Sequence, residues 1–447
     1  MGMNYLLQIF GTVTFSQPVV MSMLFVVLYM VLGVMALTRP VAAVVMYFAT
    51  SIMNPQASYP LLMDIPLAKV AAIWCLLVGL LNARKLTIRL PWIILPMAAF
   101  LIMANIATLT AIFPALAEKR FEEFNKVGLM VLMTAWIVND RKNYAFLFWG
   151  VLASFGYDVL KNLVETQTKD VWVNAKGVAG WIGDSNDWAL ALAMALPLFY
   201  VALAQNWSKG WKVRLVIGLA TAGAVLTQTL TYSRGGFLAA VVSGLIFLLM
   251  DRKPRRAVMV AAGVLAVVLI YMPGSYVDKM QSIFGLEGKA VSAWDKNVDE
   301  DAEYTGAERA YFWRVAYEIM RDHPLTGVGW GNFIKEFERR DSESEGVVAH
   351  STWFQVGAES GAVSLCFYIL MILCALGSSL ATWLKSRRLH DQWGEMHARA
   401  LFAGLMAFCV GGTFLSRENS ELLFLYIVMA AVLGPMVARN ATPAETA

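Results

Sequence analysis

Charged residues and cysteines are both scarce in this 447-residue sequence. Asp, Glu, Lys and Arg together make up 15% of the residues, whereas hydrophobic residues make up 58%. Such a composition lies outside the range of soluble globular proteins and places the chain in a membrane. The cysteines fall in apolar stretches without CxxC or Cys/His spacing, which favours small buried side chains over disulfides or a metal site. They are Cys75, Cys366, Cys374 and Cys409.

Long apolar runs are what the sequence has instead. Runs of roughly 17 to 25 residues, the length that crosses a bilayer as a helix, recur about twelve or thirteen times. Because these runs do not alternate with polar residues, they favour helices over a β-barrel. The sequence therefore predicts an all-α polytopic membrane protein. The clearest expected spans are 19–37, 92–112, 144–163, 188–205, 212–229, 235–250, 256–272, 353–382, 399–415 and 421–438, and shorter or weaker ones are 41–53, 66–83 and 124–138.

The spans predict one integral membrane domain in three parts. N-terminal transmembrane helices occupy 1–272, one large periplasmic loop that contains helices occupies 273–350, and C-terminal transmembrane helices occupy 351–447. No charged n-region with a cleavage site precedes the first apolar run, so we expect the N-terminus to be uncleaved.

Basic clusters alternate with the predicted spans and set their orientation. The positive-inside rule places each cluster in the cytoplasm, so the motif "TYSRGG" (231–236), the loop 165–187 and the segment 273–350 are expected to face outward. The last segment holds 15 acidic and 9 basic residues. It is not a cationic surface, which excludes nucleic acid as a partner. The basic clusters lie at 84–89, 140–142, 209–214, 251–256 and 385–388.

The outward segment contains one predicted amphipathic helix. Thr305 and Glu308 have capping-box spacing at its start, and Pro324 follows its end. Its apolar residues recur at helical spacing, so we expect this face to pack on the membrane domain. The range 338–346 is expected to form a polar loop, and "DED" (299–301) a solvated acidic run rather than a metal site. The apolar face consists of Phe312, Val315, Ala316 and Ile319.

Two polar residues stand where outward loops enter predicted spans. Arg234 begins a span, and Gly235 and Gly236 beside it leave room for a ligand to approach the backbone. A guanidinium at a helix N-terminus suits phosphate, although a boundary arginine can also simply reach lipid head groups. His350 precedes another span and could take a proton from a hydroxyl, or serve as a structural interfacial histidine. Glu359, deeper in the same span, is expected to be structural.

Three motifs occur in an order that resembles a known family. "TYSRGGFLA" (231–239), "ERAYFWRVAYEIMRDHPLTGVGWGNF" (308–333) and "AHSTWFQVGAESG" (349–361) resemble the O-antigen ligase and O-antigen polymerase superfamily in order and topology. Two further stretches, "TRPVAAVVMYFATSIMNPQ" (38–56) and "WIGDSNDWALALAMALPL" (181–198), look like a branch of O-glycosylation ligases associated with exosortase systems.

The resemblance implies a membrane glycosyltransferase that needs no metal and no other cofactor. Such proteins transfer a glycan from an undecaprenyl diphosphate carrier to a lipid, protein or glycan acceptor on the periplasmic face of the bacterial inner membrane. Arg234 matches the arginine that contacts the diphosphate, and His350 matches the histidine proposed to activate the acceptor hydroxyl. Arg309 looks like the second diphosphate arginine, with Arg314 and Arg321 on the same predicted helix as alternatives.

Four other residues are lesser candidates. Asp184, Asn186 and Asp187 lead into the span from 188, where they could bind sugar hydroxyls or cap the helix. Lys126, expected at the start of an outward helix, is a further diphosphate candidate.

Other functions remain open at this point. A ligase and a polymerase of lipid-linked repeat units share this chemistry, and the sequence does not separate them. A transporter would need midplane charges or broken helices, but 188–205 and 235–250 contain no Asp, Glu, Lys, Arg or His and no helix break is expected. A scaffold subunit of an export complex would tolerate alanine at Arg234 and His350. Nothing in the sequence specifies an oligomeric state.

Overall fold

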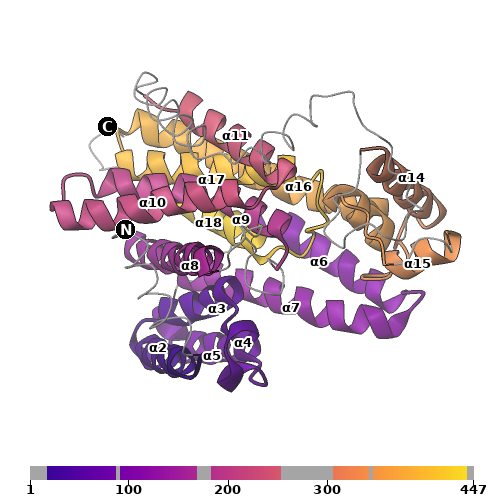
Figure 1. The fold of residues 1–447 in the computed structure, drawn as a ribbon, viewed down its shortest axis with the longest axis horizontal. Helices are drawn as coiled ribbons and strands as arrows, with labels where there is room; N and C mark the ends of the chain where they lie inside the picture. Colours follow the sequence, from indigo (N-terminus) through magenta and orange to yellow (C-terminus); the bar gives the residue numbers. More distant parts are fainter. Residues whose placement is uncertain (1–17, 87–90, 169–182, 253–305, 342–345, 440–447) are drawn as a thin grey trace.

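The computed structural model describes residues 18–86, 91–168, 183–252, 306–341 and 346–439. Within these ranges the chain is helical and contains no strand, which confirms the predicted all-α class. Figure 1 shows the helices gathered in a bundle, with α14 and α15 at one end of it. The α-helices are α2 (Pro18–Thr38), α3 (Val41–Met53), α4 (Pro55–Ser58), α5 (Leu67–Leu81), α6 (Ile94–Leu109), α7 (Pro114–Ile137), α8 (Arg141–Thr168), α9 (Ser185–Gln205), α10 (Trp211–Leu230), α11 (Arg234–Leu249), α14 (Gly306–Asp322), α15 (Phe333–Arg340), α16 (Thr352–Arg388), α17 (Gln392–Gly411) and α18 (Glu421–Arg439).

The predicted spans coincide with helices wherever the structure describes them. Four helices, α2, α9, α10 and α16, are long and apolar enough to cross a membrane by length and composition. Shorter apolar helices are α5, α6, α11 and most of α18. The expected span 256–272 lies outside the described residues. The protein is therefore a multi-pass membrane protein, as the apolar runs predicted.

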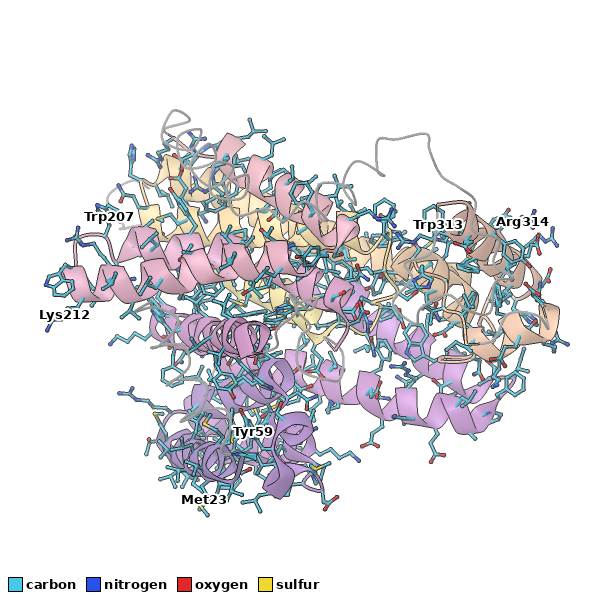
Figure 2. All side chains as sticks on the ribbon, in the orientation of Figure 1. Met23, Tyr59, Trp207, Lys212, Trp313 and Arg314 are labelled. Atoms are coloured by element: carbon cyan, nitrogen blue, oxygen red, sulfur yellow. The ribbon has the colours of Figure 1, made fainter. Side chains whose placement is uncertain are left out.

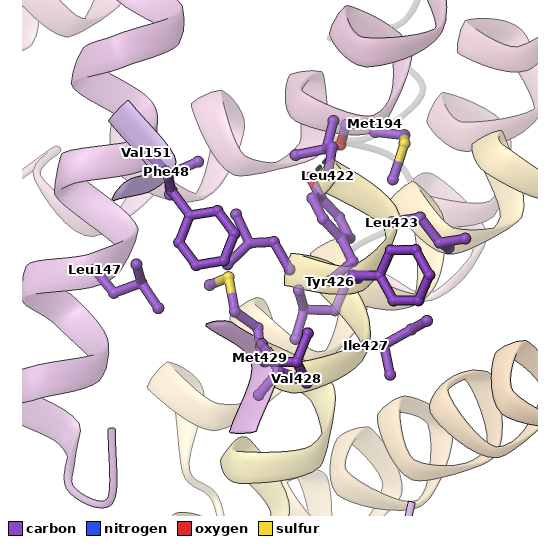
Figure 3. Close-up of a cluster of buried hydrophobic side chains, with 14 of the residues drawn as sticks. Phe48, Leu147, Val151, Met194, Leu422, Leu423, Tyr426, Ile427, Val428 and Met429 are labelled. Atoms are coloured by element: carbon purple, nitrogen blue, oxygen red, sulfur yellow. Dashed lines mark hydrogen bonds between the residues drawn. The ribbon is translucent and has the colours of Figure 1, made fainter. Parts of the chain in front are cut away.

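Helix α18 lies in the interior because it is apolar on all sides. Figure 3 shows Leu422, Leu423 and Tyr426 of α18 in a buried cluster that also contains Met194 of α9 and Phe48 of α3. The Tyr426 hydroxyl donates to the Met194 carbonyl of α9 at 2.7 Å, which satisfies its one polar atom. Helix α2 is the opposite case, because Val34 is 65% exposed and faces the lipid expected around it.

The cluster 209–214, expected in the cytoplasm, and α14, expected on the outward side, lie at opposite ends of the bundle. Figure 2 places Trp207 and Lys212 at one end and Trp313 and Arg314 at the other. Described residues of two basic clusters expected on one side, Arg141 and Arg252, pair with acidic residues at the start of α17. There Arg141 pairs with Asp391, Arg252 with Glu395, and Arg399 with Asp251. These ion pairs join α8 and the residues after α11 to α17 and its N-cap, Asp391.

Helices α7, α15 and α16 differ from the expectation. Helix α7 begins at Pro114 rather than near residue 124, because proline suits the first helical position and the charged residues that follow favour helix. Helix α15 runs to Arg340 and so includes residues expected to form a loop. Helix α16 is broken at Gly361, whose φ of 85° and ψ of 167° are not helical. The sequence reading had found no broken helix, since a glycine within an apolar run does not reveal its backbone angles.

Candidate functional site at one end of the bundle

Arg234 is the first residue of α11, as predicted. Ser233 caps this helix, and its hydroxyl accepts the Gly236 amide at 3.1 Å. The same hydroxyl donates to the Asn186 side-chain oxygen of α9 at 2.5 Å. Tyr232, just before the cap, has a left-handed φ of 53°. Arg234 thus lies at a helix N-terminus whose entry is held by α9.

Of the two glycines after Arg234, Gly236 serves helix packing, which corrects its expected role. A Cβ on Gly236 would overlap the Ala189 side chain of α9. A Cβ on Gly235 would lie 3.6 Å from the Phe414 Cβ, an ordinary contact distance. Gly236 is therefore needed for the close approach of α11 to α9, not for access of a ligand.

His350 precedes α16 and is held in a left-handed conformation with a φ of 48°. Histidine is one of the side chains that tolerate this region, but a non-glycine residue there still indicates a constrained backbone. The imidazole contacts the Phe312 ring of α14, with 5.9 Å between the ring centroids. Phe312 belongs to the predicted apolar face of α14, whose members are all buried. His350 therefore lies in the contact between α14 and the start of α16.

Hydrogen bonds fix the first turn of α16, directly after His350. The Thr352 amide donates to the Gly412 carbonyl at 2.8 Å, and the Thr352 hydroxyl donates to the Leu415 carbonyl at 2.7 Å. The Ala349 amide donates to the Gln355 side-chain oxygen at 2.9 Å. The residues on both sides of His350 are thus bound to fixed partners.

The loop 324–333 caps the other end of this short helical segment. The Val328 amide donates to the Ala358 carbonyl at 3.0 Å, and the Gly329 amide donates to the Glu359 carbonyl at 2.9 Å. Carbonyls at a helix C-terminus need such donors. The Glu359 carboxylate is buried and accepts the amides of Gly331 and Phe333 at 2.9 and 3.2 Å. Glu359 is therefore structural, as predicted.

Three aromatic rings join α14 to the segments that carry Arg234 and His350. Trp313 stacks on Phe354 of α16, with 5.6 Å between centroids and 15° between the ring planes. Its other neighbour is Phe414, at 6.5 Å. Phe414 in turn lies against Gly235, the residue after Arg234. The stack brings α11, α14 and α16 together at this end.

Arg309 lies on the side of α14 that bears Phe312 and Trp313, three and four residues further on. It is half-buried. Arg314 and Arg321 are exposed and lie roughly 120–140° around the helix from Arg309, given 3.6 residues per turn. Of the three arginines, Arg309 faces the aromatic stack.

The three polar residues before residue 188 have separate structural partners. Asp184 is the N-cap of α9 and accepts the Asn186 amide at 2.6 Å. Asn186 binds the Ser233 cap of α11. Asp187 is buried and pairs with Arg417 through both of its oxygens. Asp184 therefore caps α9, whereas Asn186 binds the cap of α11 and Asp187 binds the loop between α17 and α18.

Arg417 is a site residue that the sequence reading missed. It lies in the loop between α17 and α18, which alternation of the predicted spans places on the outward side. The sequence feature that could have pointed to Arg417 is its place in a short, outward-facing loop between two apolar runs. Its partner Asp187 is 230 residues away in the sequence, so no local pattern could pair them.

Lys126 lies well inside α7 rather than at a helix start, because α7 begins at Pro114. Its ammonium is 3.4 Å from the Glu421 carboxylate of α18. It also lines a cavity of about 280 Å³ between α5 and α7, with charged neighbours that include Lys69 and Glu122. No contact in the described structure connects Lys126 with Arg234, Arg309 or His350.

The α14–α15 unit has its own buried charge. Burial would raise the pKa of Glu336, but hydrogen bonds from Arg339 and Arg340 outweigh it and hold that pKa below its usual value. Arg340 also pairs with Asp322 at the end of α14, at 2.9 Å. Within the described residues no group of three or more His, Cys, Asp or Glu side chains is placed to hold a metal ion.

The fold and the site define a multi-pass membrane protein with Arg234, Arg309 and His350 grouped at one end of its bundle. Residues 219–369, which include all three, match the family described as O-antigen ligase, and this match supports assignment of the region to the O-antigen ligase superfamily. Residues 20–169 match a family of unknown function (DUF5935). No curated protein matches the chain. The family implies a glycosyltransferase-type enzyme that acts on lipid-linked glycans.

Proposed function

We propose that this protein transfers a glycan from an undecaprenyl diphosphate carrier to a hydroxyl acceptor on the periplasmic face of the bacterial inner membrane. The O-antigen ligase match supports a membrane glycan ligase or polymerase role. The carrier lipid, the side of the membrane and the residue roles are the further steps of the proposal.

The observation that most directly supports the proposal is the meeting of three segments around the aromatic stack. Phe414 lies beside the residue that follows Arg234, and Trp313 lies one turn of α14 from Arg309. His350 contacts Phe312 on the same helix. These contacts support a site in which two cations and one base serve a common region at one end of an apolar bundle, where a lipid-linked substrate can present its head group.

The proposed reaction is a single displacement. The His350 imidazole takes the proton from the acceptor hydroxyl as its oxygen attacks the anomeric carbon. The bond between that carbon and the diphosphate oxygen breaks, and both of its electrons stay on the diphosphate. The acceptor becomes glycosylated with inversion at the anomeric carbon, and the imidazolium returns its proton to the departing diphosphate or to water.

Arg234 and Arg309 would stabilise the charge that develops on the leaving diphosphate. Guanidinium groups bind phosphate oxygens through two parallel hydrogen bonds, and the N-terminus of α11 adds a positive dipole at Arg234. Because a diphosphate is already a good leaving group, electrostatic stabilisation of this kind suffices without a general acid.

The test is transfer in proteoliposomes that contain a labelled undecaprenyl diphosphate oligosaccharide and candidate acceptors. His350→Asn, which tolerates the left-handed backbone, should lower the rate by about 100-fold or more. Arg234→Ala and Arg309→Ala should lower it too. Arg314→Ala, on the exposed face of the same helix as Arg309, is the matched control and should transfer normally. Normal transfer by both His350→Asn and Arg234→Ala would refute the site.

The product separates the related functions. One glycan block on a foreign acceptor identifies a ligase, whereas a ladder on the carrier lipid identifies a polymerase. Solute flux without glycan transfer would identify a transporter. The break in α16 gives little support to a transporter, because the carbonyls before it are capped by Val328 and Gly329 rather than left to line a solute path.

A further inference from the structure

Arg417 lies in the loop 412–420, between α17 and α18, and is bound to the first turn of α9. Its Nε and Nη2 atoms donate to the two carboxylate oxygens of Asp187. In this bidentate geometry two parallel hydrogen bonds join the guanidinium to the carboxylate, which fixes both groups in orientation as well as in distance. The Asp187 side chain is 3% exposed and that of Arg417 is 27% exposed. The ion pair is therefore largely shielded from water.

The same loop binds the first turn of α16. The Arg417 amide donates to the Thr352 hydroxyl at 3.0 Å, and the Ser416 hydroxyl donates to the Gln355 side-chain oxygen at 3.2 Å. The Trp353 indole donates to the Thr413 hydroxyl at 3.1 Å. Thr352 is two residues from His350, so the loop fixes the backbone that carries the imidazole.

The other partner of the ion pair lies next to the segment that carries Arg234. Asp187 follows Asn186, which accepts the hydroxyl of Ser233, the cap of α11. Hydrogen bonds therefore link the cap before Arg234 to Asn186, and Arg417 to both Asp187 and the turn after His350, while the peptide bond between Asn186 and Asp187 completes the path. This path crosses three elements that are far apart in the sequence.

We infer that the Asp187–Arg417 ion pair positions His350 relative to Arg234, and that Arg417 is a positioning residue rather than a ligand of the donor. The inference rests on the proposed function for the role of His350 as base. Arg417 acts through the loop 412–420, because two of its guanidinium nitrogens are bound to Asp187. Displacement of a base by about 1 Å can lower a rate by about 100-fold, so a loosened loop has a large effect on transfer.

The first arm of the test is steady-state transfer by Arg417→Ala, Asp187→Asn and the double variant. We expect kcat to fall by about 100-fold in each with the KM for the lipid-linked donor unchanged. The double variant should be no slower than either single variant, because the two residues act as a unit. Arg417→Lys, which keeps the charge but not the fork, serves if Arg417→Ala does not fold. Asp251→Asn, which breaks the buried Arg399 pair at the opposite end, should keep its kcat.

The second arm needs no activity. Hydrogen exchange should become faster at the amides of Thr352 and Arg417 in Arg417→Ala, and remain unchanged there in Asp251→Asn. Unchanged exchange, an unchanged kcat, additive losses or a raised KM at unchanged kcat would each overturn the inference. Altered exchange in a protein whose wild type transfers no glycan would instead refute the proposed function and leave the link between loop and helix standing.

Discussion

Gly361→Ala should disrupt the site from a position where no substrate is expected to bind. The φ of 85° and ψ of 167° at Gly361 are essentially restricted to glycine, and another residue there costs about 1–3 kcal/mol. An added Cβ would also lie 2.6 Å from the Leu325 carbonyl carbon and 2.8 Å from the Pro324 carbonyl oxygen. These are backbone atoms, which cannot move aside as a flexible side chain would.

The total effect follows from adding the clash to the backbone strain. Overpacking typically costs about 1–3 kcal/mol, so we expect about 2–6 kcal/mol in all. That is a large part of the stability of an ordinary protein, about 5–15 kcal/mol. The loop 324–333 would have to leave the segment before Gly361, and the Ala362 amide would lose its 2.8 Å bond to the Pro324 carbonyl.

Gly377→Ala is the matched control, because it lies in the same helix with no positive φ and no atom within 4 Å of an added Cβ. Alanine there should stabilise the helix by up to about 1 kcal/mol. The assay compares thermal unfolding in detergent with hydrogen exchange at 324–333 and 352–360. A Gly361→Ala variant as stable as Gly377→Ala, with unchanged exchange in both ranges, would refute the argument.

Two further predictions concern helix packing and pH. Gly236→Ala should destabilise the protein by about 1–3 kcal/mol through overlap with Ala189. Ala189→Gly in the same chain should recover most of this loss. If the change in unfolding free energy of the double variant equals the sum of the two single changes, the prediction is contradicted. Because the pKa of Glu336 is lowered on folding, its contribution is complete above the unfolded value of about 4.3 and is lost as pH falls through the folded value. The protection factors of amides within α14 and α15, which compare exchange with the intrinsic rate at the same pH, should therefore fall in acid. Glu336→Gln should reduce that fall, and the same pH dependence in both proteins would contradict the prediction.

The elements that could be predicted from the sequence depend on local properties of the chain. Run length predicted helices such as α9 and α10, because crossing a bilayer needs a continuous apolar stretch. Spacing predicted the buried face of α14, because residues three and four apart lie on one side of a helix. The start of α7 was misplaced because its first turns are charged and project beyond the apolar stretch.

The features that escaped prediction depend on residues far apart in the sequence or on backbone angles. The pairing of Asp187 with Arg417 has no signature in either neighbourhood. The break at Gly361 depends on the loop 324–333 lying against it, since that loop supplies the donors that a continuous helix would not need. For the same reason Gly236 was assigned to ligand access, although its neighbour Ala189 on α9 decides its role.

The arrangement around His350 explains why a short, broken helix suits this position better than a continuous one. The segment 352–360 is fixed at its start by the loop 412–420 and at its end by the loop 324–333. A left-handed residue such as His350 persists only where its surroundings over-determine it, and both attachments supply that constraint. A continuous helix would transmit any tilt of the membrane span to the imidazole. Because the break at Gly361 separates the segment 352–360 from the rest of α16, a tilt of that span need not move the His350 imidazole, which is the base in the proposed reaction.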